Sequence, residues 1–251
     1  MSGCDDVNFI RVRSAGEPYT VEVGVLSSEK RWLGACATPF EDDRVAFDFY
    51  SDPVESVGGD YCHVEYVGRR RLAIHVSDVT GHGPEAASLS SRTSVRVRKR
   101  LSEGEGPGRI LEDLNGFLCR RFRATGMLMS FHAIVIDLSR RTLRWAGAGH
   151  PPAFLIPPRG RAIPLPSENP ILGAGPYAGK ESERRLTRGS LVAAFTDGLY
   201  ERRNGGSRGL SRILRRLESL RDAPVRKIVE SMRRASSLRE DDALFLAVRV
   251  K

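Results

Sequence analysis

The chain has 251 residues, of which 40% are hydrophobic and 28% are charged, and a mass of 27.8 kDa. This size and composition fit one larger domain or two small ones, and they exclude a disordered chain, a collagen-like repeat and a disulfide-rich miniprotein. The formal net charge is +9, but the basic residues are dispersed and aromatic residues make up only 7%, so a nucleic-acid partner is not expected.

No apolar run approaches the ~20 residues that a membrane span needs, and the first residues lack the basic and apolar regions of a secretory signal. The cysteines do not form a Cys-x-x-Cys pair; they are Cys4, Cys36, Cys62 and Cys119. We therefore expect reduced thiols in a cytoplasmic protein that has no cysteine-based zinc site and no membrane contact.

The first 44 residues read as irregular, with strand-like stretches at 20–25 and 31–37, and a firmer strand follows at 45–50. Residues 60–67 and 71–77 then predict a β-hairpin around the turn 68–70. If this turn centres on Arg69, paired residues have numbers that sum to 138, and Asp60 faces Asp78. Two carboxylates about 4 Å apart repel by roughly 4 kcal/mol at an effective dielectric near 20, so either the register slips or a cation lies between them.

Apolar residues then recur at helical spacing over residues 84–101 and 108–123. A second hairpin follows, formed by residues 131–138 and 142–148. After it we expect short strands at 153–156 and 161–165 and a buried strand at 191–196. Two amphipathic helices, marked by the apolar residues of 213–220 and 225–232, then lead to a final strand at 243–250. Hairpins outnumber crossovers, so the pattern predicts an α+β fold in which helices pack on antiparallel sheets.

Four aspartates share one kind of position, at the start or end of an expected strand: Asp60, Asp78, Asp197, and Asp241 or its neighbour Asp242. Aspartates are common at turns, so any one of them could be purely structural. Antiparallel order brings the start of one strand beside the end of the next, and all four could therefore meet at one edge. Carboxylates suit Mg²⁺ or Mn²⁺ rather than Zn²⁺, and two such ions can activate water for attack on a phosphate.

Six short motifs occur in order around these aspartates: Val57-Gly58-Gly59-Asp60-Tyr61, Ser77-Asp78-Val79-Thr80-Gly81-His82-Gly83, Ala148-Gly149-His150-Pro151-Pro152, Leu172-Gly173, Phe195-Thr196-Asp197-Gly198-Leu199-Tyr200-Glu201 and Asp241-Asp242-Ala243. Together they resemble the signatures of metal-dependent protein phosphatases, in the branch of the bacterial SpoIIE and RsbU enzymes. The resemblance covers residues 45–251, so we expect a phosphatase domain there and an N-terminal extension over 1–44.

The resemblance implies an α-β-β-α sandwich with two central antiparallel sheets. It implies hydrolysis of phosphoserine or phosphothreonine with two or more Mn²⁺ or Mg²⁺ ions, through attack by a hydroxide that bridges the metals. The implied substrate is a phosphorylated regulatory protein of the anti-sigma-factor-antagonist type, which would place the chain in sigma-factor signalling. An activating protein partner and a homodimer are left open.

Carried over by motif, the resemblance assigns metal binding and catalysis to four residues: Asp60, Asp78, Asp197 and Asp241. Asp60 would bridge the ions, and the backbone carbonyl of Val79 matches a further ligand position. The choice between Asp241 and Asp242 as the main ligand is left open. Either His82 or His150 could protonate the departing serine oxygen, since histidine titrates near neutral pH; for His150, holding its Gly-Pro loop by hydrogen bonds is the preferred interpretation.

The chain departs from the family pattern at Cys62 and His63, where an aromatic residue and an aspartate are frequent, and at Leu244, where threonine is usual. These departures motivate an alternative function, a catalytically weak or inactive phosphatase-like module that only binds regulators. A basic nucleic-acid binder is a third hypothesis and would show salt-dependent affinity. Retention of all four aspartates favours the enzyme.

Overall fold

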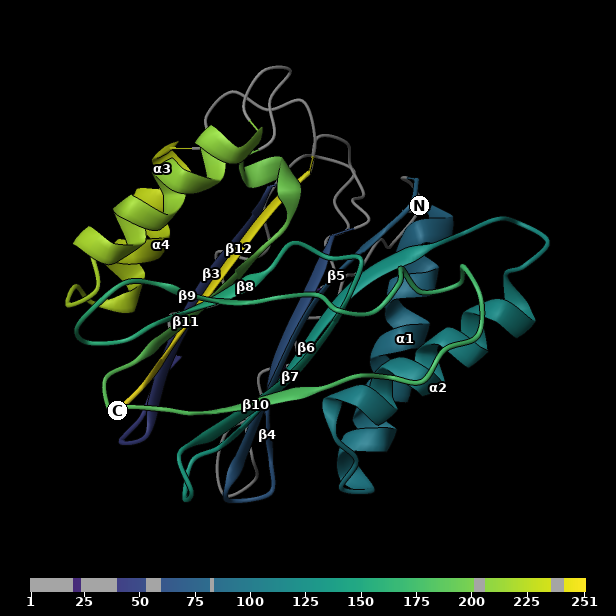
Figure 1. Cartoon of the computed structure of the whole chain (residues 1–251), viewed down its shortest axis with the longest axis horizontal. Coiled ribbons are helices and arrows are strands. Elements are labelled where there is room, and N and C mark those ends of the chain that lie inside the picture. The colour runs from purple at the N-terminus through teal and green to yellow at the C-terminus, as the bar shows by residue number, and fades with distance from the viewer. Residues whose placement is uncertain (1–19, 24–39, 53–59, 82–83, 201–205, 236–241) are drawn as a thin grey trace, which may run out of the picture.

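The computed structural model describes residues 20–23, 40–52, 60–81, 84–200, 206–235 and 242–251. In this part of the chain, two antiparallel sheets stack face to face, and a pair of helices covers the outer face of each sheet (Figure 1). The predicted α+β fold, an α-β-β-α sandwich, is confirmed. No helix in these ranges has the length and apolarity needed to cross a membrane.

The first sheet has six strands, in the spatial order β1 (Thr20–Val23), β4 (Tyr61–Val67), β5 (Arg71–Val79), β6 (Met129–Asp137), β7 (Thr142–Ala148) and β10 (Ser182–Arg185). The second sheet also has six, in the order β2 (Phe40–Glu41), β3 (Val45–Asp52), β12 (Ala243–Val250), β11 (Leu191–Phe195), β8 (Ala153–Ile156) and β9 (Ile163–Leu165). Every pairing within these sheets is antiparallel.

Helices α1 (Pro84–Ser102) and α2 (Pro107–Arg121) cover the first sheet, and α3 (Gly206–Ser219) and α4 (Val225–Ala235) cover the second (Figure 1). The apolar stripes predicted for these helices face the sheets. Leu89 and Leu101 of α1 and Leu114 of α2 are almost fully buried, for example. Burial of each such side chain stabilises the fold by roughly 1.5–3 kcal/mol.

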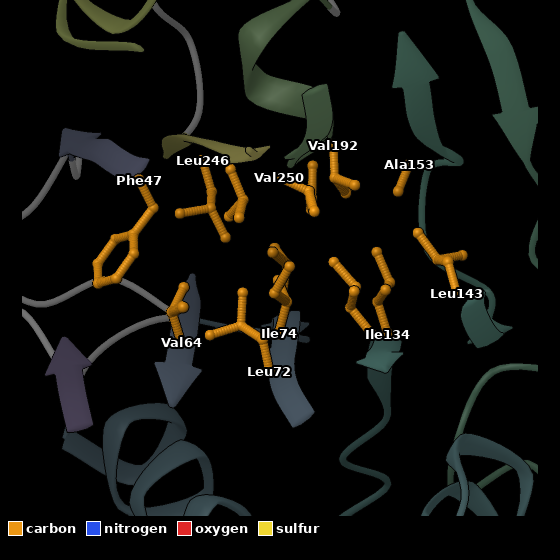
Figure 2. Packing of buried hydrophobic residues seen from close by; sticks show 14 of the residues in the cluster. Phe47, Val64, Leu72, Ile74, Ile134, Leu143, Ala153, Val192, Leu246 and Val250 are labelled. Atoms are coloured by element: carbon orange, nitrogen blue, oxygen red, sulfur yellow. The ribbon is translucent and has the colours of Figure 1, made fainter. Parts of the chain in front are cut away.

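The main core lies between the two sheets, where side chains from both inner faces meet (Figure 2). Side chains alternate between the two faces of each strand, which separates this core from the outer cores. On β5, Leu72 and Ile74 point into the space between the sheets, whereas Ala73 packs beneath α1 and α2. A third cluster joins the second sheet to α3 and α4. Each sheet is therefore buried on both faces, which explains why many of its strands read as continuous apolar runs.

The predicted register of the first hairpin is confirmed. Tyr61 pairs with Ser77 and Val67 with Arg71, so paired numbers sum to 138 along the whole ladder. Asp60 directly precedes β4, and continuing this register places it opposite Asp78 of β5. The chain keeps the two carboxylates together despite their repulsion, which indicates that their position serves a purpose other than stability.

Two of the described strands lie before residue 45. Strand β1 pairs with β4, and β2 pairs with β3, so parts of the expected N-terminal extension contribute to both sheets. The strand expected at 31–37 lies outside the described residues. The domain boundary at residue 45 stays a prediction. Strand β10 was not expected from the sequence, because its residues are mostly exposed and polar and carry no apolar alternation.

Candidate metal centre

Two aspartates reach the candidate site from the first sheet. Asp60 immediately precedes β4, and Asp78 lies one residue before the end of β5. Strand β5 also pairs with β6, in which Ser130 lies opposite Asp78. Thr80 extends this pairing beyond the strand, since its backbone N–H donates to the Leu128 carbonyl at 3.0 Å. The backbone that carries Asp78 is thereby held on both sides.

Two further aspartates come from the second sheet. Asp197 follows β11 and opens the short 3₁₀ helix η2 (Asp197–Leu199), while Asp242 directly precedes β12. Strands β11 and β12 are paired, with Phe195 opposite Phe245. The end of one strand and the start of the other therefore lie side by side. Each sheet contributes one pair of aspartates to the same edge of the sandwich.

Asp60 is the electrostatic centre of this group. It is 8% exposed, and burial is the main reason that its pKa lies well above the usual carboxyl range. The negative charges of Asp78, Asp242 and Asp197 raise this pKa further, with Asp78 the strongest of the three. Since Coulomb repulsion falls with distance, these effects place Asp78, Asp242 and Asp197 within electrostatic range of Asp60.

Thr196 connects the two pairs and was not singled out in the sequence. Its hydroxyl donates to Oδ2 of Asp60 at 2.7 Å and accepts from the backbone N–H of Leu244 at 2.9 Å. This hydroxyl lowers the pKa of Asp60, opposing the burial and the neighbouring charges. The signal available beforehand was its place in the Phe195-Thr196-Asp197 motif, directly before a candidate ligand.

We expect Thr196→Val to lower the free energy of unfolding by about 1–3 kcal/mol, because it leaves a buried carboxylate oxygen and a buried N–H without their partner. Valine keeps the shape of the side chain, so lost packing is a small part of the effect. Urea unfolding measures the change, and Thr196→Ser, which retains the hydroxyl, serves as the matched control. Equal stability of the valine variant and wild type would contradict this role for Thr196.

The donor set of this edge fits a hard divalent cation. Its side-chain donors are carboxylate oxygens, which suit Mg²⁺ or Mn²⁺. Within the described ranges, no three His, Cys, Asp or Glu side chains are arranged to hold a metal ion as they stand. The described carboxylates lie at one edge of the sandwich. Such an edge suits Mg²⁺, which keeps several waters and is commonly held by one or two protein carboxylates.

The other residues predicted from the sequence, which are further candidate ligands and the candidate proton donor His82, lie as follows. Val79 is the last residue of β5, next to Asp78, and its side chain is buried in the cluster beneath α1 and α2. Asp241 and His82 lie outside the described residues, so their assignments stay predictions. Asp242 lies within the described residues, and its negative charge raises the pKa of Asp60.

His150 is buried in its loop. Its Nδ1 lies 2.8 Å from the hydroxyl of Ser130, and its carbonyl accepts a hydrogen bond from the Ser167 hydroxyl at 2.6 Å. Burial lowers the pKa of His150 to about 3, so the ring is neutral at pH 7. These contacts favour the interpretation of His150 as a residue that holds its loop.

The Leu172-Gly173 motif also supports the scaffold. Gly173 has φ of +94°, a left-handed conformation that favours glycine. Its N–H donates to the side chain of Asn115 on α2 at 2.9 Å, and the Asn115 amide donates to the Gly175 carbonyl at 2.7 Å. Leu172 is fully buried and bridges to Met129. This loop therefore ties α2 to the sheet.

The three departures from the family pattern pack into the interior. Cys62 and Leu244 face the core between the sheets. Burial raises the pKa of the Cys62 thiol, which keeps it protonated. His63 lies on the opposite face of β4, stacked on His75 with ring centroids 4.9 Å apart. All three side chains are buried in the interior.

The family described as Stage II sporulation protein E (SpoIIE) matches residues 68–251. Among curated relatives, the phosphoserine phosphatase RsbU of Bacillus subtilis (strain 168) is 23% identical over 192 residues, which are 76% of this chain and 56% of RsbU. The chain spans about half the length of the curated relatives it matches.

Two solved structures share the fold. The RsbU and RsbW domains of Rv1364c from Mycobacterium tuberculosis give a TM-score of 0.73 at 22% identity, over 83% of this chain and 62% of that one. RsbX, solved in complex with magnesium, gives a TM-score of 0.70 at 18% identity, over 85% of this chain and 99% of that one. At these identities, the likeness shows the fold alone.

Proposed function

This chain belongs to the SpoIIE family, and from that membership we propose that it is a metal-dependent protein phosphatase acting on phosphoserine or phosphothreonine. The observation that carries the proposal is the group of strand-end carboxylates around buried Asp60. The name of its relative RsbU, a phosphoserine phosphatase, supports the substrate class.

Asp60, Asp78 and Asp197 would hold the metal ions, together with the Val79 carbonyl and with Asp241 or Asp242. When bound, two or more Mg²⁺ or Mn²⁺ ions would activate water for attack on the phosphate and offset the charge on its oxygens. The magnesium complex of RsbX, which shares the fold, supports this choice of metal.

The protein's own residues would position the metal-binding carboxylates and would supply no competing nucleophile. Thr196 fixes one oxygen of Asp60 by its hydrogen bond, which orients the carboxylate. The described neighbours of the aspartates offer no activated side-chain nucleophile, because Cys62 points into the core with a raised pKa and Ser77 is fully buried. Water is therefore the attacking group that we propose.

For the biological substrate, we propose a phosphorylated regulatory protein of the anti-sigma-factor-antagonist type, on the strength of the family resemblance. An activating partner, a homodimer and a cytoplasmic location stay predictions. The alternative, an inactive binding module, is not favoured, since Cys62, His63 and Leu244 are buried in the interior and the carboxylates around Asp60 are retained.

The proposal is tested by hydrolysis of p-nitrophenyl phosphate and of a phosphoserine peptide with Mn²⁺, with Mg²⁺ and with EDTA. We expect hydrolysis that needs a divalent cation, falls at least about 100-fold in EDTA and returns when metal is added in excess. Full activity in EDTA would overturn the metal assignment. A folded protein that binds no divalent cation by calorimetry and hydrolyses neither substrate would overturn the enzyme.

A further inference from the structure

The layer formed by α3 and α4 carries most of the excess positive charge. Residues 206–235 contain nine Arg or Lys and three Asp or Glu, a net charge of +6 out of the +9 of the whole chain. The apolar residues of the two helices, such as Leu217 and Ile228, are buried against the second sheet. The charged side chains therefore lie on the outer face of the layer, which Figure 1 shows on the side away from the first sheet.

The opposite helical layer differs, because its cations are paired within the protein. Asp113 of α2 accepts hydrogen bonds from Arg96 and Arg100 of α1 at 2.8–3.0 Å. Arg109 pairs with Glu112 on α2. These pairs satisfy much of the positive charge of α1 and α2 locally. What distinguishes the two layers is therefore the pairing of their cations and not the presence of cations.

On α3 and α4, Arg226 pairs with Glu230 at 3.0 Å. Six other exposed cations have no acidic partner among the described residues, and we call them the basic face: Arg208, Arg212, Arg215, Arg216, Lys227 and Arg234. Charges left unpaired on one surface produce a positive potential that attracts anionic partners.

The basic face begins next to the candidate metal centre. A Cβ atom on Gly209 would lie 2.4 Å from the Tyr200 carbonyl oxygen, so the first turn of α3 packs directly on the chain that follows Asp197. Arg208 belongs to this turn, and Arg212 and Arg215 follow along the helix. The basic face therefore starts on the turn that packs against the chain after Asp197.

An acidic site repels an anionic substrate, and a neighbouring basic surface would offset this repulsion. The aspartate edge and a phosphorylated protein repel each other until metal and phosphate meet, whereas a basic surface beside the edge accelerates encounter and fixes orientation. We propose that the basic face docks acidic residues that flank the phosphoserine of a protein substrate. This inference rests on the proposed phosphatase function and adds to it a preference for acidic substrates.

Other anionic partners fit the face less well. Residues 206–235 contain no Phe, Trp or Tyr, so the face offers no stacking platform for nucleic-acid bases. Among the described residues, Val95 on α1 is the only exposed large hydrophobic side chain, so α3 and α4 lack the apolar anchors of a membrane-bound helix. The planar guanidinium groups of arginine instead suit paired hydrogen bonds to carboxylates.

The test compares two phosphoserine peptides, one flanked by four glutamates and one flanked by serine and glycine. For wild type in low salt, we expect kcat/KM to be about tenfold higher for the acidic peptide, and we expect high salt to reduce this preference. The double variant Arg212→Glu/Arg215→Glu should bring the preference to about one or below. The control Arg69→Glu/Arg70→Glu, with the same charge change in the exposed turn between β4 and β5, should keep the wild-type preference.

Binding of a fluorescent acidic peptide without phosphate, measured by polarisation, tests the docking independently of catalysis. If no peptide and no small ester is hydrolysed with any metal, the phosphatase proposal fails, and the binding data still decide whether the face docks acidic chains. Equal kcat/KM for both peptides, or equal loss in both double variants, would overturn the docking proposal. Tighter binding of duplex DNA than of the acidic peptide, lost in Arg212→Glu/Arg215→Glu, would also overturn it and indicate a nucleic-acid surface.

Discussion

Replacing Asp60 by Asn should lower metal-dependent hydrolysis of a phosphoserine peptide by about 1000-fold or more, a loss of about 4 kcal/mol of transition-state stabilisation. Asparagine keeps the shape of the side chain and an oxygen that accepts the hydrogen bond from Thr196. What it removes is the negative charge at the centre of the carboxylate group. The variant therefore tests the charge and leaves the local packing in place.

The same change should have the opposite effect on stability when metal is absent. In metal-free protein, Asp78, Asp197 and Asp242 repel an ionised Asp60, which is also penalised by burial. Removal of its charge should raise the free energy of unfolding at pH 7 by about 1 kcal/mol or more. Wild type should regain stability relative to the variant when Mn²⁺ or Mg²⁺ is added, because the metal binds the folded state.

Asp43→Asn is the matched control, since Asp43 is exposed between β2 and β3, next to the end of β3 that lies opposite the aspartate edge. It should change neither activity nor the stabilisation by metal. Metal-dependent turnover at the wild-type rate in a folded Asp60→Asn protein would exclude Asp60 as a ligand. Reduced stability of metal-free Asp60→Asn would mean that hydrogen bonding of Asp60, and not repulsion, dominates at this position.

Much of the fold follows from local sequence patterns. A turn centred on Arg69, between β4 and β5, predicted the register that places Asp60 opposite Asp78. The last strand, Ala243–Val250, was predicted to the residue, because an apolar run there follows three acidic residues. Side chains in these segments meet the same kind of neighbour at every second position, so the pattern determines the pairing.

Features that depend on contacts between distant segments could not be predicted in this way. Thr196 and Asp60 are 136 residues apart, and their hydrogen bond exists only because the two sheets stack. Strand β10 is an edge strand whose exposed residues form no pattern, so its pairing with β7 has no local signal in the sequence. Likewise, the aspartates were expected at one sheet edge, whereas each sheet contributes a pair.

Because four of its histidines are buried, we expect the protein to lose stability below pH 6.5. His63, His75, His132 and His150 are each at most 5% exposed. Burial lowers the pKa of His63, His132 and His150 to about 3 and that of His75 well below its usual value. All four are neutral in the folded protein across the range in which unfolded histidines take up protons.

The sign follows from proton binding. Below pH 6.5, each histidine binds a proton in the unfolded chain and not in the folded one, so acid favours unfolding until the pH reaches about 3. Each contributes up to about 1.4 kcal/mol per pH unit. Asp48, whose pKa is raised to about 6 by burial, acts in the opposite direction, since the folded state takes up its proton first. Glu65 also has a raised pKa and offsets part of the loss.

The variant His132→Leu removes the contribution of one histidine to this pH dependence of stability. His132 is 1% exposed, and neither of its ring nitrogens has a hydrogen-bond partner in the described part of the chain. Leucine should therefore fit without breaking a hydrogen bond, and its packing cost should not depend on pH. Urea unfolding of both proteins at pH 7.5 gives that cost. At pH 5.5, we expect the difference to shift by about 1.4 kcal/mol in favour of the variant.

A difference that stays constant between pH 7.5 and 5.5 would mean that folded His132 accepts a proton as readily as the unfolded chain, which its buried position excludes unless the sandwich opens. A shift of the expected size would show that the space between the sheets stays closed to water under mild acid. Because Asp60 and Asp78 lie at the end of the same sheet, the aspartate edge would then keep its spacing until the whole domain unfolds. The loss of folded protein between pH 7.5 and 5.5, followed by circular dichroism, should accordingly be smaller in His132→Leu than in wild type.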